Sequence, residues 1–196
     1  VRGDLYGRQP ISNQNYVPDA GHRSMTLMTS RGCAYRCSFC VVHGARRPRY
    51  LSADRVVQEM ETLEREHGAS FIHIQDPLFM GDRQRLLAIA EGIRLRGLRV
   101  PWGCDTHVNT VRPDVIEAIA GANCYELSIG LESGVQRVLA RVGKQTTVER
   151  GARAVRLIKA NSDIKLEGLF VLGLPGEQPG DALRTILFAL RLPLDL

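Results

Sequence analysis

The sequence predicts an α/β fold in which a parallel sheet curls into a partial (β/α) barrel with helices outside it. Two observations lead to this prediction. Short apolar runs alternate with amphipathic helical patterns five times, and the strand always precedes its helix. The chain also has 196 residues, of which 44% are hydrophobic and 24% charged, enough to bury one core without disulfide bonds.

The first strand is expected at 24–29, where the sequence reads SMTLMT. Ser52 is suited to cap a helix whose apolar residues recur every three or four positions until Gly68. A second strand follows at 69–75, and Asp82 is suited to cap the next helix. This stretch therefore supplies the first two strand–helix units.

A third strand is expected at 98–104, although Pro101 weakens its pattern. Pro113 suits the first position of the following helix. A fourth strand is expected at 124–131, followed by a short helix and by a second helix that a capping box opens at Thr146. The middle of the chain thus continues the same alternation.

The fifth strand is expected at 164–173, with a helix in the stretch PGDALRTILFALRL after it. The final residues, LPLDL, look like the approach to a sixth strand, so we expect five of the six units of the barrel. Residues 1–24 are rich in Gly, Pro, Asn and Gln without an apolar period, which is typical of a linker from an upstream domain. The expected organisation is a lead-in at 1–24 and a core at 25–196, truncated before its sixth strand.

Composition limits the classes of function. No run of about 18 apolar residues is present, so no membrane span is expected, and the N-terminus VRGDLYGRQP does not resemble a signal peptide. We therefore expect a cytoplasmic location. The formal net charge of +5 is modest, and the arginine-rich stretches ARRPR and RLRGLR lack interleaved aromatic residues. Charge alone therefore argues against a nucleic-acid partner.

Three of the five cysteines, Cys33, Cys37 and Cys40, form the pattern C-x3-C-x2-C directly after the first expected strand. Functional groups in parallel barrels gather at this end of the strands. Cysteine thiolates are the usual ligands of iron–sulfur clusters, and three of them leave one iron of a four-iron cluster open, as catalytic sites do. The alternative is a zinc ion bound with His43 as a fourth ligand; a disulfide is disfavoured in a reducing compartment.

This loop, with Phe39 before its last cysteine, resembles the signature of radical S-adenosylmethionine (SAM) enzymes, and the resemblance extends from about residue 25 to the end. It implies a partial barrel of the radical SAM type. It also implies that Cys33, Cys37 and Cys40 hold a [4Fe-4S] cluster whose open iron binds SAM. One electron from the reduced cluster then cleaves SAM to a 5′-deoxyadenosyl radical, and Phe39 sits beside the bound cofactor.

The end of the second expected strand, IQDPLF, resembles the QDxxF version found in the branch of this superfamily with an N-terminal cobalamin domain. The resemblance implies that Gln75 and Asp76 contact the amino group of SAM, since a carboxylate binds an ammonium group well. From the residues alone, Asp76 is equally suited to form a turn before Pro77.

Two further stretches resemble the same branch. GLESG, at the end of the fourth strand, implies that Glu132 and Ser133 contact the ribose and amino-acid part of SAM. In RVGKQTT, Lys144 takes the place of a basic residue near the SAM carboxylate, although it also suits a solvated lysine. The fifth strand ends in LGLPGE, and the resemblance implies that Val171 and Leu172, at this end of the strand, lie near the adenine.

Three other residues are notable. Cys104 is expected just after the third strand, either facing the cavity or buried as a small hydrophobic residue. Cys124 begins a strand at the opposite end of the sheet and is expected to be structural. His107 stands where relatives in this branch often carry Arg, so a substrate contact cannot be transferred to it.

The sequence therefore predicts a radical SAM core that cleaves SAM reductively for C-methylation, or a related carbon-centred modification, of a small-molecule substrate. Cobalamin would be held by a domain outside this chain, and flavodoxin or ferredoxin would donate the electron. One alternative is a methylthiotransferase-like enzyme acting on RNA or a ribosomal protein. A different class of alternative is a non-catalytic zinc or Fe–S module that binds nucleic acid.

Overall fold

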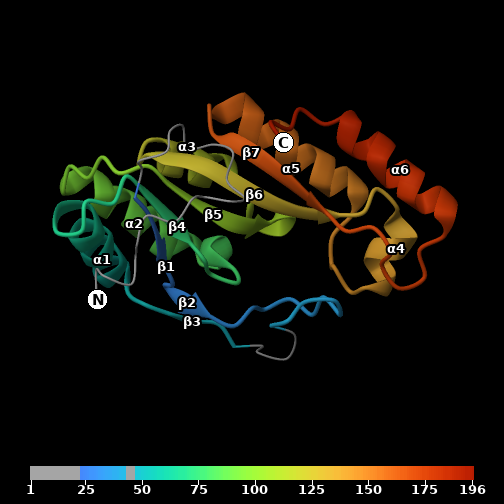
Figure 1. Ribbon diagram of the computed structural model, residues 1–196, viewed down its shortest axis with the longest axis horizontal. Coiled ribbons are helices and arrows are strands. Elements are labelled where there is room, and N and C mark those ends of the chain that lie inside the picture. Colours follow the sequence, from blue (N-terminus) through green and yellow to red (C-terminus); the bar gives the residue numbers. More distant parts are fainter. Residues whose placement is uncertain (1–22, 43–46) are drawn as a thin grey trace.

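The computed structural model describes residues 23–42 and 47–196, and a five-stranded parallel sheet lies at its centre (Figure 1). Each strand pairs in parallel with the next one in the order β1-β4-β5-β6-β7, as expected for a barrel that winds in one direction. The strands are β1 (Ser24–Leu27), β4 (Phe71–Ile74), β5 (Trp102–His107), β6 (Cys124–Glu132) and β7 (Lys165–Phe170). The α/β fold with a parallel sheet is confirmed. Most of the expected lead-in and His43 lie outside the described residues.

Helices cover one face of this sheet. The core contains apolar side chains from the first, second, third and fifth helices, packed against alternate strand residues such as Ile72 and Leu127. The helices are α1 (Ala53–Arg65), α2 (Arg83–Leu95), α3 (Pro113–Ala120), α4 (Gln136–Arg141), α5 (Val148–Asn161) and α6 (Pro179–Leu190). Shorter elements are β2 (Ser30–Arg31), β3 (Arg49–Tyr50), η2 (Phe79–Gly81) and η3 (Val108–Thr110). None of the helices among the described residues has the length and apolar character needed to cross a membrane.

The expected helix starts are mostly confirmed. The Ser52 side chain accepts a hydrogen bond from the Arg55 N–H at the start of α1, and the Asp82 side chain accepts one from the Arg85 N–H at the start of α2. Pro113 is the first residue of α3. The expected capping box at Thr146 is wrong by one residue, because Thr147 caps α5 and the Thr146 hydroxyl bonds to Asn109 instead.

The third strand is the main correction to the sequence-based elements. It begins at Trp102, after Pro101, and runs to His107, so the expected range 98–104 is wrong. Proline has no N–H to donate to a sheet. The apolar residues that precede it, Leu98 and Val100, are buried in the core without belonging to the strand. Three residues beyond the expected end, Asp105, Thr106 and His107, are thereby brought to the functional end of the sheet.

The fifth strand ends at Phe170 and is shorter than the expected 164–173. Beyond it, the last residues of the chain lie along the free edge of β7. The Asp195 N–H donates to the Leu166 carbonyl at 2.9 Å, and the Gly168 N–H donates to the Leu196 carbonyl at 3.0 Å. This pairing agrees with the expected approach to a sixth strand; truncation before that strand stays a prediction.

Candidate functional site

A cavity of about 160 Å³ opens at the C-terminal ends of the central strands. The cysteine loop, the β4–η2 connection, and the ends of β5, β6 and β7 all contribute to its wall. Six of the residues expected to hold the cluster or SAM line it: Cys33, Cys37, Phe39, Cys40, Glu132 and Lys144. The structure therefore brings together two groups of predicted residues that lie about 100 positions apart in the chain.

The cysteine loop presents three free thiols to this cavity. Cys37 is buried, whereas Cys33 and Cys40 are partly exposed. Among the described residues, no three His, Cys, Asp or Glu side chains converge on a position for one metal ion. A single zinc ion requires such convergence, whereas the thiolates that hold an iron–sulfur cluster bind separate irons around a larger body. His43, the fourth ligand of the zinc alternative, lies outside the described residues, so this finding concerns the three cysteines alone.

Contacts from the loop to the sheet hold the cysteines over the cavity. The Tyr35 ring stacks on the His107 ring at the end of β5, with 3.7 Å between centroids and 9° between planes. The Ser38 N–H donates to the Val142 carbonyl at 2.9 Å. Burial raises the pKa of the Cys37 thiol, while the nearby Lys144 ammonium acts in the opposite direction. A positive group close to the thiol favours its thiolate form, which is the metal-binding form.

Asp76 lies outside the lining of the cavity, and its carboxylate is occupied by the chain itself. Oδ1 accepts hydrogen bonds from the backbone N–H groups of Thr29 and Ser30, at 2.5 and 2.9 Å, and Oδ2 accepts one from the Thr29 hydroxyl. Arg85 donates to the same hydroxyl at 2.7 Å. Gln75 is exposed and also outside the lining. The observed partners of Asp76 fix the segment that leads into the cysteine loop; a contact of Gln75 or Asp76 with SAM stays a prediction.

Glu132 and Lys144 form a buried ion pair inside the cavity, with 2.7 Å between Oε1 and Nζ. Lys144 is 5% exposed, so the interpretation as a solvated lysine is wrong. Glu132 ends β6 with a φ of 63°, after an irregularity in its pairing with β7. A Cβ atom on Gly130 would lie 2.6 Å from both charged atoms. The pair therefore depends on glycine at that position.

His107 joins the ion pair to the cysteine loop. Its Nδ1 accepts a hydrogen bond from the Asn109 N–H, so the proton of the neutral ring is on Nε2, which donates to the Lys144 carbonyl at 3.1 Å. Burial, together with the Lys144 ammonium, lowers the pKa of His107 to about 3. The ring is thus neutral near pH 7. It lines the cavity and supports both Tyr35 and the segment that carries Lys144.

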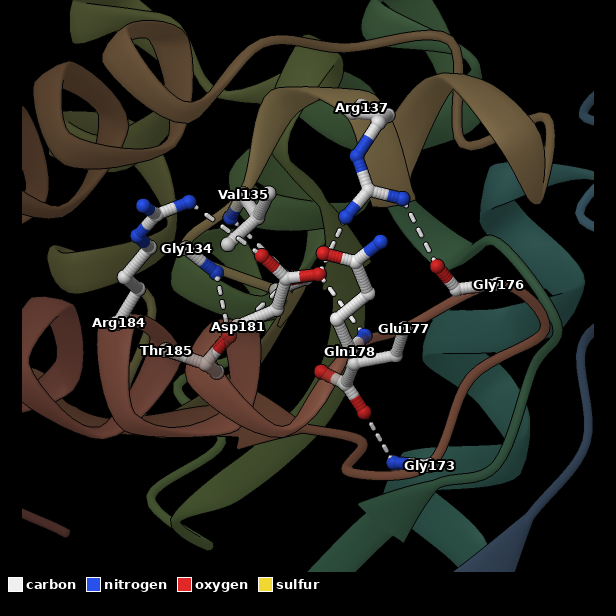
Figure 2. Close-up of polar contacts among 11 residues, drawn as sticks. Gly134, Val135, Arg137, Gly173, Gly176, Glu177, Gln178, Asp181, Arg184 and Thr185 are labelled. Atoms are coloured by element: carbon white, nitrogen blue, oxygen red, sulfur yellow. Dashed lines mark hydrogen bonds and ion pairs between the residues drawn. The ribbon is translucent and has the colours of Figure 1, made fainter.

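Ser133 points away from the cavity into the protein. It is fully buried, and its hydroxyl lies 3.2 Å from the Thr185 hydroxyl of α6. Figure 2 shows the neighbouring contacts, in which the Gly134 N–H donates to Thr185 and Asp181 joins α6 to Arg137 of α4. These contacts anchor the turn after β6. A contact of Ser133 with SAM stays a prediction, without support from its observed position.

Val171 and Leu172 also lie outside the cavity lining, and Leu172 is 53% exposed. Leu169 of β7 lines the cavity in their place, because the strand ends sooner than the apolar run in the sequence. Sequence analysis also missed Asp105 and Thr106, which line the cavity from β5. The sequence analysis missed both residues because it placed the end of the third strand at residue 104, before them. Cys104, one residue earlier, is 1% exposed and belongs to the apolar core.

Comparisons with known proteins agree with this geometry. The family model of the radical SAM superfamily matches residues 27–189. The uncharacterized methyltransferase PH0819 of Pyrococcus horikoshii is 32% identical over 171 residues, which are 86% of this chain and 37% of that protein. The anaerobic magnesium-protoporphyrin IX monomethyl ester cyclase of Cereibacter sphaeroides is 32% identical over 173 residues, which are 85% of this chain and 28% of that protein.

A similar solved structure is that of OxsB, a cobalamin-dependent SAM radical enzyme with aqua-cobalamin and SAM bound. The TM-score is 0.76 at 27% sequence identity, and the match covers 84% of this chain and 26% of OxsB. The chain thus spans between about a quarter and two fifths of the length of these three proteins. Since the family model covers most of the chain and the three cysteines line its cavity, the chain belongs to the radical SAM superfamily.

Proposed function

We propose that this chain is the core of an enzyme that binds a [4Fe-4S] cluster and SAM and cleaves SAM reductively, for methylation or a related modification at carbon of a small molecule. One observation carries the proposal. Cys33, Cys37 and Cys40 line the same cavity as a buried pair of opposite charges, Glu132 and Lys144. The thiolates can hold a cluster. The two charged side chains next to them can bind the zwitterionic amino-acid part of SAM.

The residues of the chain divide the binding of SAM between them. When bound, the reduced cluster supplies the electron that breaks a carbon–sulfur bond of SAM. Glu132 accepts hydrogen bonds from the SAM ammonium or ribose, and Lys144 binds the SAM carboxylate, since charge-assisted hydrogen bonds anchor such groups. His107 holds the backbone of Lys144 in place, and Phe39, which is 38% exposed, covers the rim of the cavity.

The whole protein would require further components. Cobalamin would be bound by a domain outside this chain, a proposal supported by the description of OxsB as cobalamin-dependent and of PH0819 as a methyltransferase. We assign flavodoxin or ferredoxin as the electron donor, a small molecule as the substrate, and the cytoplasm as the location. The zinc module is set aside, because the chain belongs to the radical SAM superfamily.

Anaerobic reconstitution of the full-length protein with iron and sulfide tests this function. We expect visible cluster absorbance and, after reduction, consumption of SAM to 5′-deoxyadenosine or S-adenosylhomocysteine, measured by liquid chromatography. Alanine at Cys33, Cys37 or Cys40 should abolish both signals. Cys124→Ala should preserve both, because Cys124 is buried at the other end of the sheet.

Two results would contradict the proposal. One is a colourless protein that retains a single tightly bound zinc ion. The other is loss of SAM consumption in a folded Cys124→Ala variant. The methylthiotransferase alternative differs in its product: transfer of a methylthio group, detected by mass spectrometry, would support it instead.

A further inference from the structure

The sheet face opposite the core carries polar side chains in layers below the cavity. Residues paired across neighbouring strands project to the same face, so the register defines each layer. The cavity layer contains His107, Gly130 and Leu169. Two residues earlier on each strand, about 7 Å lower, lie Asp105, Ser128 and Glu167. Asp105 itself lines the cavity, so the two layers are continuous.

A third carboxyl, Glu126, lies one layer below Ser128 on β6. It is 3% exposed, and its Oε2 is fully buried without a hydrogen-bond partner among the described residues. Burial and the charges of Glu167 and Asp105 raise the pKa of Glu126 to about 7. A buried carboxyl oxygen without a partner costs about 1–3 kcal/mol or more. An incoming group that donates hydrogen bonds would recover this free energy.

The surroundings of these carboxyls leave their charge incompletely balanced. The Ser128 hydroxyl donates to Glu167 at 2.9 Å, and His73 of β4 acts on the charge of Asp105. Lys165, the register neighbour of Glu126, has its ammonium 3.9 Å from Asp195 at the sheet edge. The carboxyls thus outnumber the cations that the described part of the chain directs to this face.

The spacing of the carboxyls also indicates what kind of cation they suit. No three His, Cys, Asp or Glu side chains in the described ranges approach one ion position, so the group is not a compact metal site. Its oxygens are instead spread over two layers of three strands. A protonated amine or a guanidinium carries several N–H donors and can reach acceptors separated in this way.

We infer that Asp105, Glu126 and Glu167 bind the cationic end of the substrate, a protonated amine or guanidinium, in the two acidic layers below the SAM cavity. The inference rests on the proposed function, because it names the substrate class of that same site. With its charged end held by these carboxyls, the carbon skeleton of the substrate extends toward the cavity. The position is suited to present a carbon atom to the SAM side while the charged end stays fixed.

Isothermal titration calorimetry on the reconstituted full-length protein tests the site with four probes of one size: butylammonium, butylguanidinium, butanol and butyrate. We expect the two cations to bind, and butanol and butyrate not to bind. Glu126→Gln and Glu167→Gln should each weaken cation binding about tenfold or more, the range for hydrogen bonds to charged groups. The matched control is Glu117→Gln, which removes the same charge from the exposed surface of α3 and should leave binding unchanged.

The inference would be overturned if butanol bound as tightly as the cations, or if Glu117→Gln weakened cation binding as much as Glu126→Gln. It would be overturned equally if a folded wild-type protein bound no cation. Competition by Mg²⁺ at equal affinity would also overturn it, since the site would then accept any cation. Thermal unfolding of each variant checks that it is folded, and Glu167→Gln keeps the test open if Glu126→Gln does not fold.

Failure of this inference is distinguishable from failure of the proposed function. The Cys33→Ala protein, in which the cluster is expected to be lost, should still bind the butyl cations, because Cys33 is not part of the acidic layers. Wild-type protein that consumes SAM without binding any cation would contradict only the inference. Wild-type protein that binds cations without consuming SAM would contradict only the proposed function.

Discussion

Asp76 follows β4 and Glu132 ends β6, both are buried, and sequence motifs predict a contact with SAM for each. Their surroundings are different. Asp76 accepts three hydrogen bonds from Thr29 and Ser30, two of them from backbone N–H groups, whereas Glu132 faces the cavity with the Lys144 ammonium as its partner. The first carboxylate holds a segment of backbone, and the second is one half of a pair that lines a binding cavity.

The difference shows how to distinguish an acidic residue that stabilises the fold from one that is available to bind a ligand. A carboxylate has about four lone-pair positions, and Asp76 already fills three of them with groups that cannot move away. Glu132 is paired with a flexible side chain that can share it with an incoming ligand. Substitutions at Asp76 should therefore change stability first, and substitutions at the Glu132–Lys144 pair should change the affinity for SAM.

The largest effect is expected for Asp76→Ala. It leaves two buried N–H groups and a hydroxyl without their acceptor, and it removes a negative charge close to buried Arg85. We expect a loss of about 3–5 kcal/mol in the free energy of unfolding, measured by urea denaturation. Asp76→Asn, which keeps one acceptor oxygen, should lose less. A stable Asp76→Ala protein with reduced affinity for SAM would instead make Asp76 a ligand contact, as the motif predicts.

Lys144→Met tests the other member of the comparison. It leaves the Glu132 carboxylate buried without its cation, so the free energy of unfolding should fall by about 3 kcal/mol and SAM binding should weaken. The double variant Glu132→Gln/Lys144→Met should recover stability but not affinity, because no buried charge is then left alone. Equilibrium dialysis with labelled SAM measures the affinity. Full affinity in the double variant would exclude the pair from SAM binding.

Glu126 extends the comparison to a buried acid, one oxygen of which has no hydrogen-bond partner among the described residues. Its pKa of about 7 in the folded state lies above the ordinary 4.5, so between these values the folded state binds more protons than the unfolded state. Its contribution to the free energy of unfolding, about 3 kcal/mol, is fully present below pH 4.5 and is lost as pH rises to 7. Urea denaturation across this range should show that loss in the wild type and a flatter profile in Glu126→Gln. Identical profiles would contradict the assignment.

The smallest change in stability is expected for Gly130→Ala, at about 1–2 kcal/mol. The added Cβ would lie 2.6 Å from Glu132 Oε1 and Lys144 Nζ and would push the pair apart, while the Asp76 contacts remain intact. We expect weaker SAM binding in the dialysis experiment. Gly180→Ala is the control, since a Cβ there meets no atom within 4 Å. Unchanged SAM affinity in Gly130→Ala would show that the pair is dispensable.

The order of the strands and most helix caps could be predicted because they depend on local pattern. Ser52 and Asp82 cap helices through residues only three positions away. The third strand could not be placed, since the apolar residues before Pro101 look like a strand, whereas the actual strand contains Asp105 and other polar residues that face away from the core.

The cavity could be predicted only in part. The cysteine spacing is local, and the structure places this loop at the cavity, at the C-terminal ends of the strands, where it was expected. The partners of Asp76 lie 46 and 47 residues away, and the partner of Ser133 lies 52 residues away. No local pattern shows whether such a side chain turns toward the cavity or into the protein, because packing of distant segments decides it.

The backbone of Glu132 has a consequence for attempts to engineer this protein. Its φ of 63° is in the left-handed region, where a residue with a side chain is strained by about 1–2 kcal/mol relative to glycine. Glycine at this position would relieve that strain, but it would leave the Lys144 ammonium buried without its carboxylate, at a larger cost of about 3–5 kcal/mol. The strain is located where the carboxylate is needed, so relieving it by substitution is expected to lower both stability and ligand binding unless Lys144 is replaced as well.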